Sequence, residues 1–548
     1  GGDPERAHRR GSADPGSVRI PKYTIFRNLS VNALTAPADI DRRIGVVAAK
    51  TAGLPPDALR SWRILAKSVD SRRGAPQLVY TLLAEVEKTS SAARKLELVP
   101  PEMLAQFEAP RLELPETTLL HPLVVGTGPA GIFAALALAM AGTRPIVLDR
   151  GPEVEPRFAA VQHFLETREL EESANLLIGE GGAGTFSDGK LYTGTRDGNS
   201  GFILNAFAEA GAPAEIRYLK RPHIGSDRLR LVAAGLRKRI LDLGGEFRFG
   251  VEVTDLLLRD GRCRGVVTAS GETIEAPLTL IAAGLGGREL SRRLRERGAA
   301  CEFKSFQIGC RIEHPQELVD RRQYRLTGSR PEALGAAEYH MVSHPQRAPG
   351  VSTFCMCPGG EILNATAWRG RSVTNGMSDY ARAGEFANSC LIVTFPPEKF
   401  TGPDAAYARL EALEKAVFEQ GGCDYTLPAQ DAAAFLRRRN GLSSRRTSCR
   451  CGIVPGRIDR LLPEELGAGI AAALTHFDRL MPGFIRHGRL IGAETCVSSP
   501  LRFLRDPATL ESSLAGLYLG GEGAGCAGGI MSAAADGLRL ALAMLRRG

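Results

Sequence analysis

The chain has 548 residues, 43% of them hydrophobic and 24% charged, which is the composition of a soluble globular protein of about two to four domains. The net charge is +9, but aromatic residues do not interleave with the basic ones, so we expect a basic surface rather than a nucleic-acid-binding site. No apolar run reaches the roughly 20 residues of a membrane-spanning helix. The oligomeric state is open at this stage.

Eleven cysteines are present, and they do not suggest a disulfide framework. Two C-x-C pairs stand out, Cys355/Cys357 and Cys449/Cys451, and neither has the spacing of a zinc or iron–sulfur site. We therefore expect no metal, and reduced thiols in the cytoplasm. Because the sequence begins with Gly1, the plastid stroma is the alternative compartment if a targeting peptide has been removed. Cys355 and Cys357 are either a redox dithiol or packed free thiols, and the strain of a C-x-C disulfide favours the second.

The N-terminal part of the chain predicts a small domain. Residues 1–20 are rich in Gly, Pro, Ser and Arg and are expected to be a disordered tail. Residues 21–90 then show a β-α-β-β pattern, which is typical of a small α+β domain, with strands at 23–31, 62–69 and 78–86 and a helix at 39–51. The proline-rich stretch 91–119 is interpreted as a linker.

A dinucleotide-binding turn follows at residues 121–135, HPLVVGTGPAGIFAA. A buried strand at 123–125 leads into Gly126, Gly128 and Gly131 and then into an apolar helix. Gly126 permits the turn, Gly128 lets a pyrophosphate approach the backbone, and Gly131 lets helix and strand pack closely. The pattern alone is a weak signal, and its partners elsewhere in the chain decide its meaning.

Two features extend the turn. The strand 145–149 ends in Asp149, 21 residues beyond Gly128, at the spacing of a carboxylate that accepts from a ribose hydroxyl; the alternative is a surface aspartate. The loop 179–190, GEGGAGTFSDGK, nearly spells a P-loop, but Leu191 stands where a Ser or Thr would hold Mg²⁺. We interpret this loop as backbone that approaches a planar cofactor closely.

The rest of the chain predicts one interrupted cofactor domain. We expect a helix at 227–243, strands at 247–253 and 264–269 around a turn at 260–261, and a buried strand at 277–284. The residue pattern changes over 300–490, where we expect helices at 405–419 and 429–438. We interpret this region as an inserted substrate or cap domain. It contains no second G-x-G-x-x-G, so a resident second dinucleotide is not expected. The segment 516–537 then returns to a strand, a glycine turn and a small-residue helix.

Several motifs together resemble one family. They are EGGAGTFSDGK (180–190), RPHIGSD (221–227), FCMCPGGEI (354–362), TNGMSDYARAGEFANS (374–389), ETCVSSPLR (494–502) and GEGAGCAGGIMSAAADG (521–537). The chain resembles the FAD-dependent, or NAD(FAD)-utilising, dehydrogenases of bacteria with plastid relatives in plants and algae, within the glutathione-reductase-like FAD superfamily. Asp149 stands where that family more often has Glu, and the Cys449/Cys451 pair is peculiar to this chain.

The resemblance implies an α/β fold. We expect a Rossmann-like, three-layer FAD-binding domain formed by residues 120–299 and 491–548, an inserted α+β cap domain at 300–490, and the small N-terminal α+β domain. FAD is the implied cofactor, with NAD(P)H considered as a transient electron donor. The residues implied to bind FAD are Gly126, Gly128, Pro129, Ala130, Gly131, Asp149, Arg150, Gly181, Gly182, Gly184, Thr185, Val253, Gly284, Gly521, Glu522, Gly528, Gly529 and Ile530.

Residues that face the substrate are harder to predict. The candidates are polar side chains near the last cofactor segment, in the insert and in the RPHIGSD motif: Glu494, Ser498, Ser499, Arg502, Asn375, Ser378 and His223. Loop capping explains the serines, the amide and the charged pair about as well, and a structural histidine is commoner than a catalytic one.

Three functions compete at this stage. The leading prediction is an FAD-dependent oxidoreductase that moves a hydride or electrons between FAD and an unidentified small-molecule substrate. The alternatives are an FAD-dependent RNA-modifying enzyme, suggested by the basic charge, and a flavin-bound assembly or structural factor without turnover.

Overall fold

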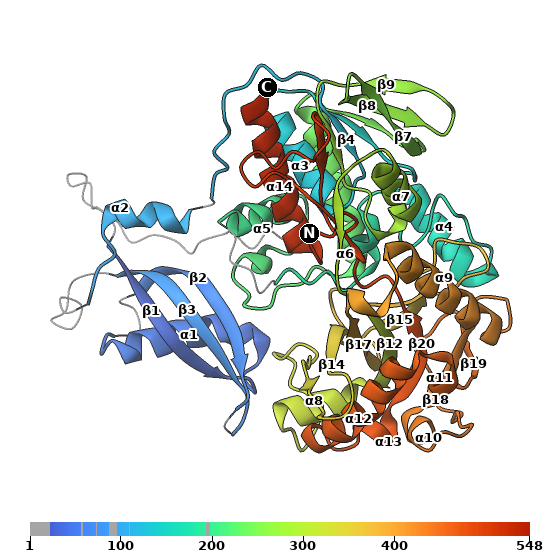
Figure 1. Cartoon of the computed structure of the whole chain (residues 1–548). Coiled ribbons are helices and arrows are strands. Elements are labelled where there is room, and N and C mark those ends of the chain that lie inside the picture. Colours follow the sequence, from blue (N-terminus) through green and yellow to red (C-terminus); the bar gives the residue numbers. More distant parts are fainter. Residues whose placement is uncertain (1–21, 56–58, 73, 87–95, 109, 193–197) are drawn as a thin grey trace, which may run out of the picture.

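The computed structural model describes residues 22–55, 59–72, 74–86, 96–108, 110–192 and 198–548, so the predicted tail at 1–20 lies outside the described residues. Figure 1 shows a small three-stranded unit beside a much larger body that contains all the other sheets. The mixed α/β class predicted from the sequence is confirmed. Within the described ranges, no helix is both long and apolar enough to cross a membrane.

The small unit consists of one helix and an antiparallel sheet of order β1-β3-β2. Its elements, which match the predicted pattern, are β1 (Tyr23–Asn32), α1 (Pro37–Thr51), β2 (Leu59–Asp70) and β3 (Gln77–Val86). Ile44 and Ala48 of the helix pack on Leu29 and Leu82 of the sheet. The unit contacts the larger body where Lys67 donates its N–H to Tyr218 O at 2.9 Å, and Leu334 completes its core. The predicted linker contains α2 (Pro101–Leu104) and a 3₁₀ turn (Ala105–Phe107).

A five-stranded parallel sheet organises the next part of the chain, in the order β22-β10-β4-β5-β6. Its strands are β4 (Leu123–Val125), β5 (Ile146–Leu148), β6 (Glu246–Arg248), β10 (Thr279–Ile281) and β22 (Leu517–Leu519). The last strand of the chain thus pairs beside β10, so segments almost 400 residues apart in sequence share one sheet, as the glycine motifs predicted.

Each face of this sheet is covered by a separate apolar core. Side chains of four helices form one core: α3 (Pro129–Met140), α5 (Ser200–Glu209), α6 (Ser226–Asp242) and α14 (Ile530–Arg547). The other core is formed with α7 (Arg288–Glu296) and an antiparallel meander, β7 (Val253–Arg259), β8 (Arg262–Thr268) and β9 (Thr273–Glu275). α3 is buried on all sides from Ala130 to Ala139, which explains its uniformly apolar sequence.

Two predicted elements differ from the structure. The strand predicted at 247–253 is divided, because β6 ends at Arg248, Gly250 adopts a φ of +70°, and β7 begins only at Val253 in a different sheet. The helix predicted at 429–438 is shorter, since Ala429 to Asp431 belong to a strand that pairs with two neighbours, and α10 begins at Ala432. In both places the pairing of the backbone overrides the local pattern.

A seven-stranded sheet forms the remainder of the larger body, in the order β13-β14-β17-β12-β20-β18-β19. The strands are β12 (Phe306–Pro315), β13 (Val342–Ser343), β14 (Val351–Cys357), β17 (Phe386–Phe395), β18 (Leu427–Asp431), β19 (Ile453–Pro455) and β20 (Arg489–Glu494). The helices that share its core are α4 (Val154–Thr167), α8 (Gln316–Tyr324), α9 (Pro403–Gln420), α10 (Ala432–Leu436), α11 (Ile458–Leu461), α12 (Glu464–Leu480) and α13 (Phe484–His487). β20 runs across the boundary predicted at residue 490.

Two short ribbons complete the fold. They are the antiparallel pairs β11 (Cys301–Phe303) with β21 (Leu501–Phe503), and β15 (Glu361–Asn364) with β16 (Thr374–Met377). The first pair joins the two ends of the cap region to each other, because β11 precedes β12 and β21 follows β20.

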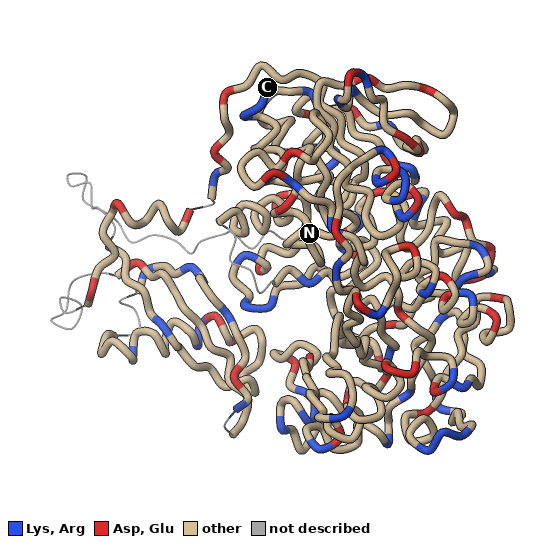
Figure 2. Tube along the Cα trace, in the orientation of Figure 1, with Lys and Arg blue, Asp and Glu red and all other residues tan. Residues whose placement is uncertain are grey.

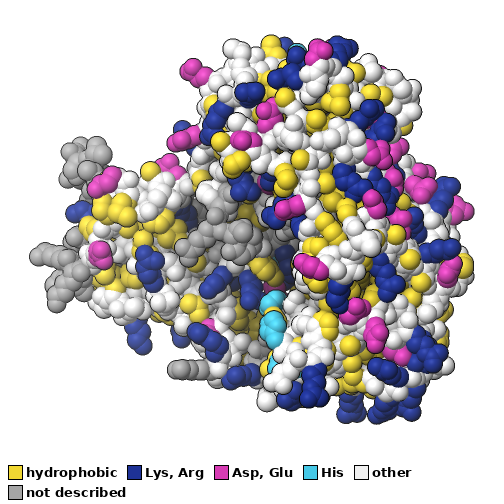
Figure 3. Space-filling model, viewed as in Figure 1, with side chains coloured by type: hydrophobic (Ala, Val, Ile, Leu, Met, Phe, Trp, Pro, Cys, Tyr) yellow, Lys and Arg dark blue, Asp and Glu magenta, His cyan; other side chains and the backbone are white. Residues whose placement is uncertain are grey.

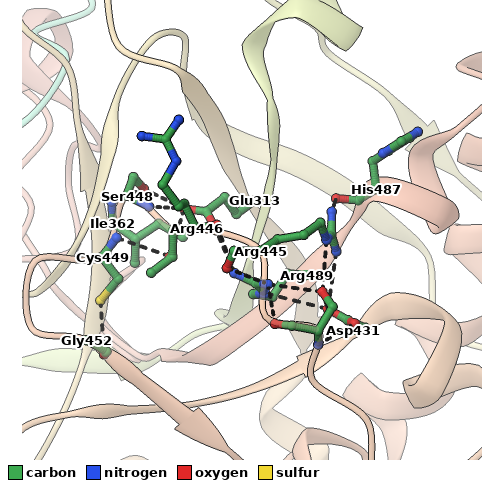
Figure 4. Close-up of polar contacts among 12 residues, drawn as sticks. Glu313, Ile362, Asp431, Arg445, Arg446, Ser448, Cys449, Gly452, His487 and Arg489 are labelled. Carbon is green, nitrogen blue, oxygen red and sulfur yellow. Dashed lines mark hydrogen bonds and ion pairs between the residues drawn. The ribbon is translucent and has the colours of Figure 1, made fainter.

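A buried arginine anchors the loop 441–452 to the seven-stranded sheet (Figure 4). Arg489, only 2% exposed, donates to the carbonyl oxygens of Ser443 at 3.0 Å and of Arg445 and Arg446 at 3.2 Å. Glu313, on the neighbouring strand, accepts from the backbone N–H of Ser448 at 2.8 Å. This network fixes the segment that carries Cys449 and Cys451 within the core of the sheet, where both are buried free thiols.

Candidate cofactor and substrate site

The first glycine turn joins β4 to α3 in a conformation that requires glycine at two of its positions. Gly126 has a φ of +99°, and a Cβ there would lie 2.4 Å from Ala282 O. A Cβ at Gly131 would lie 1.8 Å from Gly126 O, so helix and turn touch at this point. Gly128 differs, because a Cβ there would meet nothing closer than Gly182 Cα at 3.9 Å. The turn therefore leaves open space at Gly128, beside the free N–H groups of the first turn of α3.

Asp149, at the end of β5, holds this turn. Its Oδ2 accepts from the N–H of Thr127 at 2.9 Å and from the hydroxyl of Thr127 at 2.5 Å, while Oδ1 accepts from the N–H of Gly151 at 2.8 Å. The carboxylate is 8% exposed and borders the cavity described below. Oδ1 accepts this one hydrogen bond and keeps a lone pair for a further donor, so Asp149 can hold the turn and still accept from a ribose hydroxyl, as predicted.

A second glycine loop lies against the first. Gly182, with a φ of +65°, would place a Cβ 3.0 Å from Gly128 Cα, so the two loops nearly touch. Gly182 and Gly184 border the cavity, whereas Gly181 and Thr185 do not. Thr185 is buried and donates its hydroxyl to Glu180 O at 3.3 Å, and a Cβ at Gly181 would meet that hydroxyl at 2.1 Å. These two residues shape the loop from behind.

The last segment of the chain closes the same site. α14 begins at Ile530 directly after Gly529, which has a φ of +93°. A Cβ at Gly284, Gly528 or Gly529 would meet nothing within 4 Å, and all three border the cavity. Glu522 also borders it, and desolvation raises the pKa of its carboxyl to about 7, against the weaker opposing effect of Lys304.

One cavity of about 910 Å³ brings these segments together. The backbone side of it, which we call the glycine wall, is formed by the two glycine loops, the end of β10 and the start of α14. Residues of the predicted cofactor set that border the cavity are Gly126, Gly128, Pro129, Ala130, Asp149, Arg150, Gly182, Gly184, Val253, Gly284, Gly521, Glu522, Gly528, Gly529 and Ile530. Gly131 does not border it and acts through the packing of α3.

Polar and ionisable side chains form another part of the cavity lining, which we call the charged wall: Asp188, Lys190, Glu338, Cys355, Asn375 and Glu494. Asp188 is 2% exposed, receives two hydrogen bonds from Arg382 at 2.9 and 2.6 Å, and pairs with Lys190 at 2.8 Å. Although burial alone would raise the pKa of Asp188, these two cations hold it well below its usual range. Lys190 also donates to Met356 O, which fixes its ammonium at the edge of β14.

A second buried ion pair lies behind the charged wall. Arg311 on β12 has no exposed surface and donates from Nε to Glu494 Oε2 at 2.5 Å and from Nη2 to Glu494 Oε1 at 3.1 Å. The same guanidinium donates to Asn375 Oδ1 at 2.9 Å and to Cys355 O at 2.8 Å. One arginine thus orients two predicted residues, Glu494 and Asn375, and also holds the backbone of β14 at Cys355. Sequence reasoning missed Arg311, because its strand also contains Gln307, Glu313 and His314 and so gives no local signal for it.

Cys355 projects into the cavity because its strand is irregular. The pairing of β14 with β17 shifts register between Phe354 and Cys357, and Cys355 has a φ of +42°. Such a bulge turns a side chain that a regular strand would direct elsewhere. Cys357 is buried and donates its thiol to Cys355 O at 3.3 Å, so the two are free thiols without a disulfide between them. Desolvation of the thiolate raises the pKa of the Cys355 thiol to about 12.

Five of the predicted substrate residues lie outside the main cavity. Ser498 and Ser499 border a separate, small pocket and accept backbone N–H groups of Gln307 and Leu501. Arg502 is paired on the surface with Glu302 at 2.5 Å. In this structure the two serines bond to loop backbone and the arginine forms a surface ion pair, as in the structural alternative given for these candidates.

Ser378 is buried and His223 is half-buried, and neither borders the cavity. Ser378 Oγ lies against Gly360, and His223 Nε2 lies 3.0 Å from Tyr380 O. Burial lowers the pKa of His223, and its ring stacks on Tyr380 at 5.4 Å between centroids. Their positions do not support the predicted catalytic role.

The comparisons with known proteins identify the family. Residues 305–497 match the family described as "FAD-dependent protein, C-terminal domain-like". An uncharacterized protein of Clostridium beijerinckii is 39% identical over 428 residues, which is 77% of this chain and 80% of that protein. The chain belongs to this family of FAD-dependent proteins. FAD is accordingly its cofactor.

More distant similarity extends to solved flavoprotein structures. The chain is similar to CtdE in complex with FAD (13% identity, 78% of this chain and 84% of that one, TM-score 0.34) and to the flavin-dependent brominase Bmp2 (12%, 79% and 80%, 0.36). It is also similar to L-proline dehydrogenase from P. horikoshii (12%, 79% and 95%, 0.33). At such low scores these likenesses carry no argument about the activity of this protein.

The cavity fits the cofactor that the family requires. Open space at Gly128, Gly284, Gly528 and Gly529 is space that a Cβ would fill, and it lies beside the N-termini of α3 and α14, which attract negative charge. In the described part of the chain no cluster of three or more His, Cys, Asp or Glu residues could hold a metal ion.

Proposed function

We propose that the protein is an FAD-dependent oxidoreductase that transfers a hydride or electrons between tightly bound FAD and a small-molecule substrate. The observation that supports this most is the cavity with two different walls. One wall offers backbone to a cofactor, and the other offers fixed charges, a thiol and an amide to a second molecule. A purely structural flavin site has no need of the second set.

In this proposal the glycine-rich segments have the Rossmann-like role predicted from the sequence. The N–H groups at the start of α3 bind the pyrophosphate, Asp149 binds the ribose while it holds Thr127, and Val253 contacts the adenine through its backbone. When bound, FAD supplies the electron-accepting ring. NAD(P)H remains a candidate transient donor.

The charged wall then orients the substrate. Lys190 and Asn375 offer hydrogen-bond donors at positions fixed by Asp188 and Arg311, so little reorganisation is needed when a substrate binds. Glu494 borders the cavity, and Arg311 donates to both of its oxygens, so its carboxyl is held in place as a hydrogen-bond acceptor for the substrate.

Figure 2 shows Lys/Arg and Asp/Glu interspersed along the trace of both bodies rather than separated on different sides. Basic side chains on the visible face in Figure 3 likewise alternate with acidic and apolar ones. This distribution favours a small-molecule substrate over the RNA-modifying alternative, because RNA binding depends on a continuous basic surface.

Anaerobic stopped-flow reduction of the purified FAD-loaded protein by NADH and by NADPH, followed by a screen of acceptors, tests the proposal. We expect rapid bleaching of the flavin by one donor and reoxidation by a specific acceptor. The variant Glu494→Gln should slow turnover at least tenfold with FAD still bound, whereas Glu302→Gln, which removes an exposed partner of Arg502, should not. A protein that binds FAD but is oxidised and reduced no faster than free FAD would be a structural flavoprotein, and one that stays colourless with added FAD would have no flavin role.

A further inference from the structure

Arg157, on α4, lies completely buried beneath the second glycine loop. Its side chain has no solvent exposure, and its Nε donates to Asn175 O at 2.9 Å. Its Nη1 donates to three carbonyl oxygens of that loop, those of Gly179 at 3.2 Å, Glu180 at 2.6 Å and Gly182 at 2.9 Å. The guanidinium carbon also lies 4.9 Å from the ring centroid of Phe186, at the end of the same loop.

No carboxylate neutralises this guanidinium within ion-pair distance in the part of the chain that the structure describes. The nearest acids are committed elsewhere: Glu180 pairs with Arg237 at 2.8 Å, and Asp149 accepts from Thr127 and Gly151. The remaining nitrogen, Nη2, is buried without a hydrogen-bond partner. Burial lowers the pKa of Arg157 to about 10, which leaves it a cation at neutral pH. Carbonyl oxygens solvate this charge, but a buried cation without an ion-pair partner is still costly, which suggests that it has a second function.

The loop that Arg157 holds separates it from the cavity by a single layer of backbone. A Cβ at Gly179 would lie 2.5 Å from the Cδ of Arg157, and on the other side a Cβ at Gly182 would lie 3.0 Å from Gly128 Cα. Gly179, Gly182 and Gly184 border the cavity itself. The positive charge therefore lies behind the loop that meets the phosphate-binding turn, in surroundings where water does not screen it.

We propose that Arg157 is a positioning residue for FAD with two effects. It fixes the loop 179–184 against the cofactor through its carbonyl contacts, and its charge stabilises negative charge in the cavity. Removal of the charge should therefore make the bound FAD harder to reduce. This inference depends on FAD binding and not on the proposed reaction, so failure of the oxidoreductase assays would leave it intact.

The test measures the reduction potential of FAD bound to the full-length protein, by equilibration with a reference dye, together with FAD affinity and the midpoint of unfolding. For Arg157→Met we expect at least a tenfold fall in the equilibrium constant for two-electron reduction, which corresponds to about 30 mV. Arg157→Lys keeps the charge but cannot reach four carbonyl groups, so it should bind FAD at least tenfold more weakly. Its equilibrium constant for two-electron reduction should stay within threefold of the wild-type value.

Arg230→Met is the matched control. Arg230 is an exposed cation over Phe158, the ring that stacks on Phe186, so its loss alters the same aromatic pair without removing the buried charge. It should leave potential and affinity unchanged. If Arg157→Met does not fold, Arg157→Gln takes its place as the neutral variant. A wild-type potential in the neutral variant would overturn the electrostatic effect, and wild-type FAD affinity in Arg157→Lys would overturn the positioning effect.

Discussion

The glycine wall and the charged wall of the cavity are built in opposite ways. The glycine wall is made of backbone from short segments with local motifs, and its shape depends on side chains that are absent. The charged wall depends on long side chains held by buried ion pairs, Asp188 with Arg382 and Glu494 with Arg311. We infer that the first wall is specialised for one cofactor shape, whereas the second determines which molecule meets that cofactor. If so, substitutions in one wall should leave the role of the other intact.

Removal of one charge behind the charged wall should have the largest effect on stability. Arg311→Met leaves Glu494 buried without its partner, and such a change costs about 3–5 kcal/mol of unfolding free energy. The double variant Arg311→Met/Glu494→Leu should regain most of that stability, because replacing a whole buried pair by apolar residues is often neutral. Urea denaturation of the three proteins measures both effects. A single variant as stable as wild type would show that this pair is accessible to water.

Two glycines of the first turn should separate folding from cofactor binding. Gly131→Ala places a methyl group 1.8 Å from Gly126 O and should cost about 3 kcal/mol of stability in the protein without FAD. Gly128→Ala has room for the methyl group, so it should cost no more than about 1 kcal/mol but weaken FAD binding strongly, because the methyl group occupies cofactor space. Unfolding curves and FAD titration of both variants measure this. Equal FAD affinity in Gly128→Ala and wild type would contradict the assignment of that space.

Most of the residues predicted to bind FAD border the cavity, and they could be selected from the sequence because each glycine motif is local. Gly126, Gly128 and Gly131 fall within six residues. Their spacing predicts which backbone positions must closely approach the packed helix, the strand or the cofactor. The charged wall was largely missed, since its pairs form between segments far apart in sequence: Arg311 and Glu494 are 183 residues apart, and Asp188 and Arg382 are 194 apart. Glu494 and Asn375 were predicted, but not the arginine that orients both. A single sequence contains no local signal for such pairings.

Asp149 combines features of the two walls, because it lies at the end of a local motif but acts through a buried carboxylate. Its substitution should cost less unfolding free energy than Arg311→Met or Gly131→Ala. In Asp149→Asn, one oxygen and one NH₂ group must face three donors, so at least one N–H or O–H of Thr127 or Gly151 loses its acceptor. Hydrogen bonds to a charged group contribute about 2 kcal/mol, and we expect a loss of that size together with weaker FAD binding. The comparison with Asp459→Asn, whose carboxylate accepts from Arg457 at 2.7 Å and does not border the cavity, isolates the effect on FAD. An unchanged FAD affinity in Asp149→Asn would show that the turn needs no carboxylate.

Glu522 is an ionisable side chain on the otherwise backbone-rich glycine wall, and it should make stability depend on pH. Desolvation raises its folded-state pKa to about 7, above its ordinary value of 4.5, so the protonated form is favoured by folding. The stability that this provides is fully present below about pH 4.5 and is lost as the pH rises through about 7. Glu522→Gln is neutral at every pH, so without FAD it should lack the part of the pH-dependent loss of stability that Glu522 causes. Near pH 5 the variant and the wild type should be similar in stability. Urea midpoints between about pH 5 and about pH 8 measure the difference. Parallel pH profiles for the two proteins would mean that Glu522 titrates as in water, and the glycine wall would then be more open to solvent than its buried surroundings indicate.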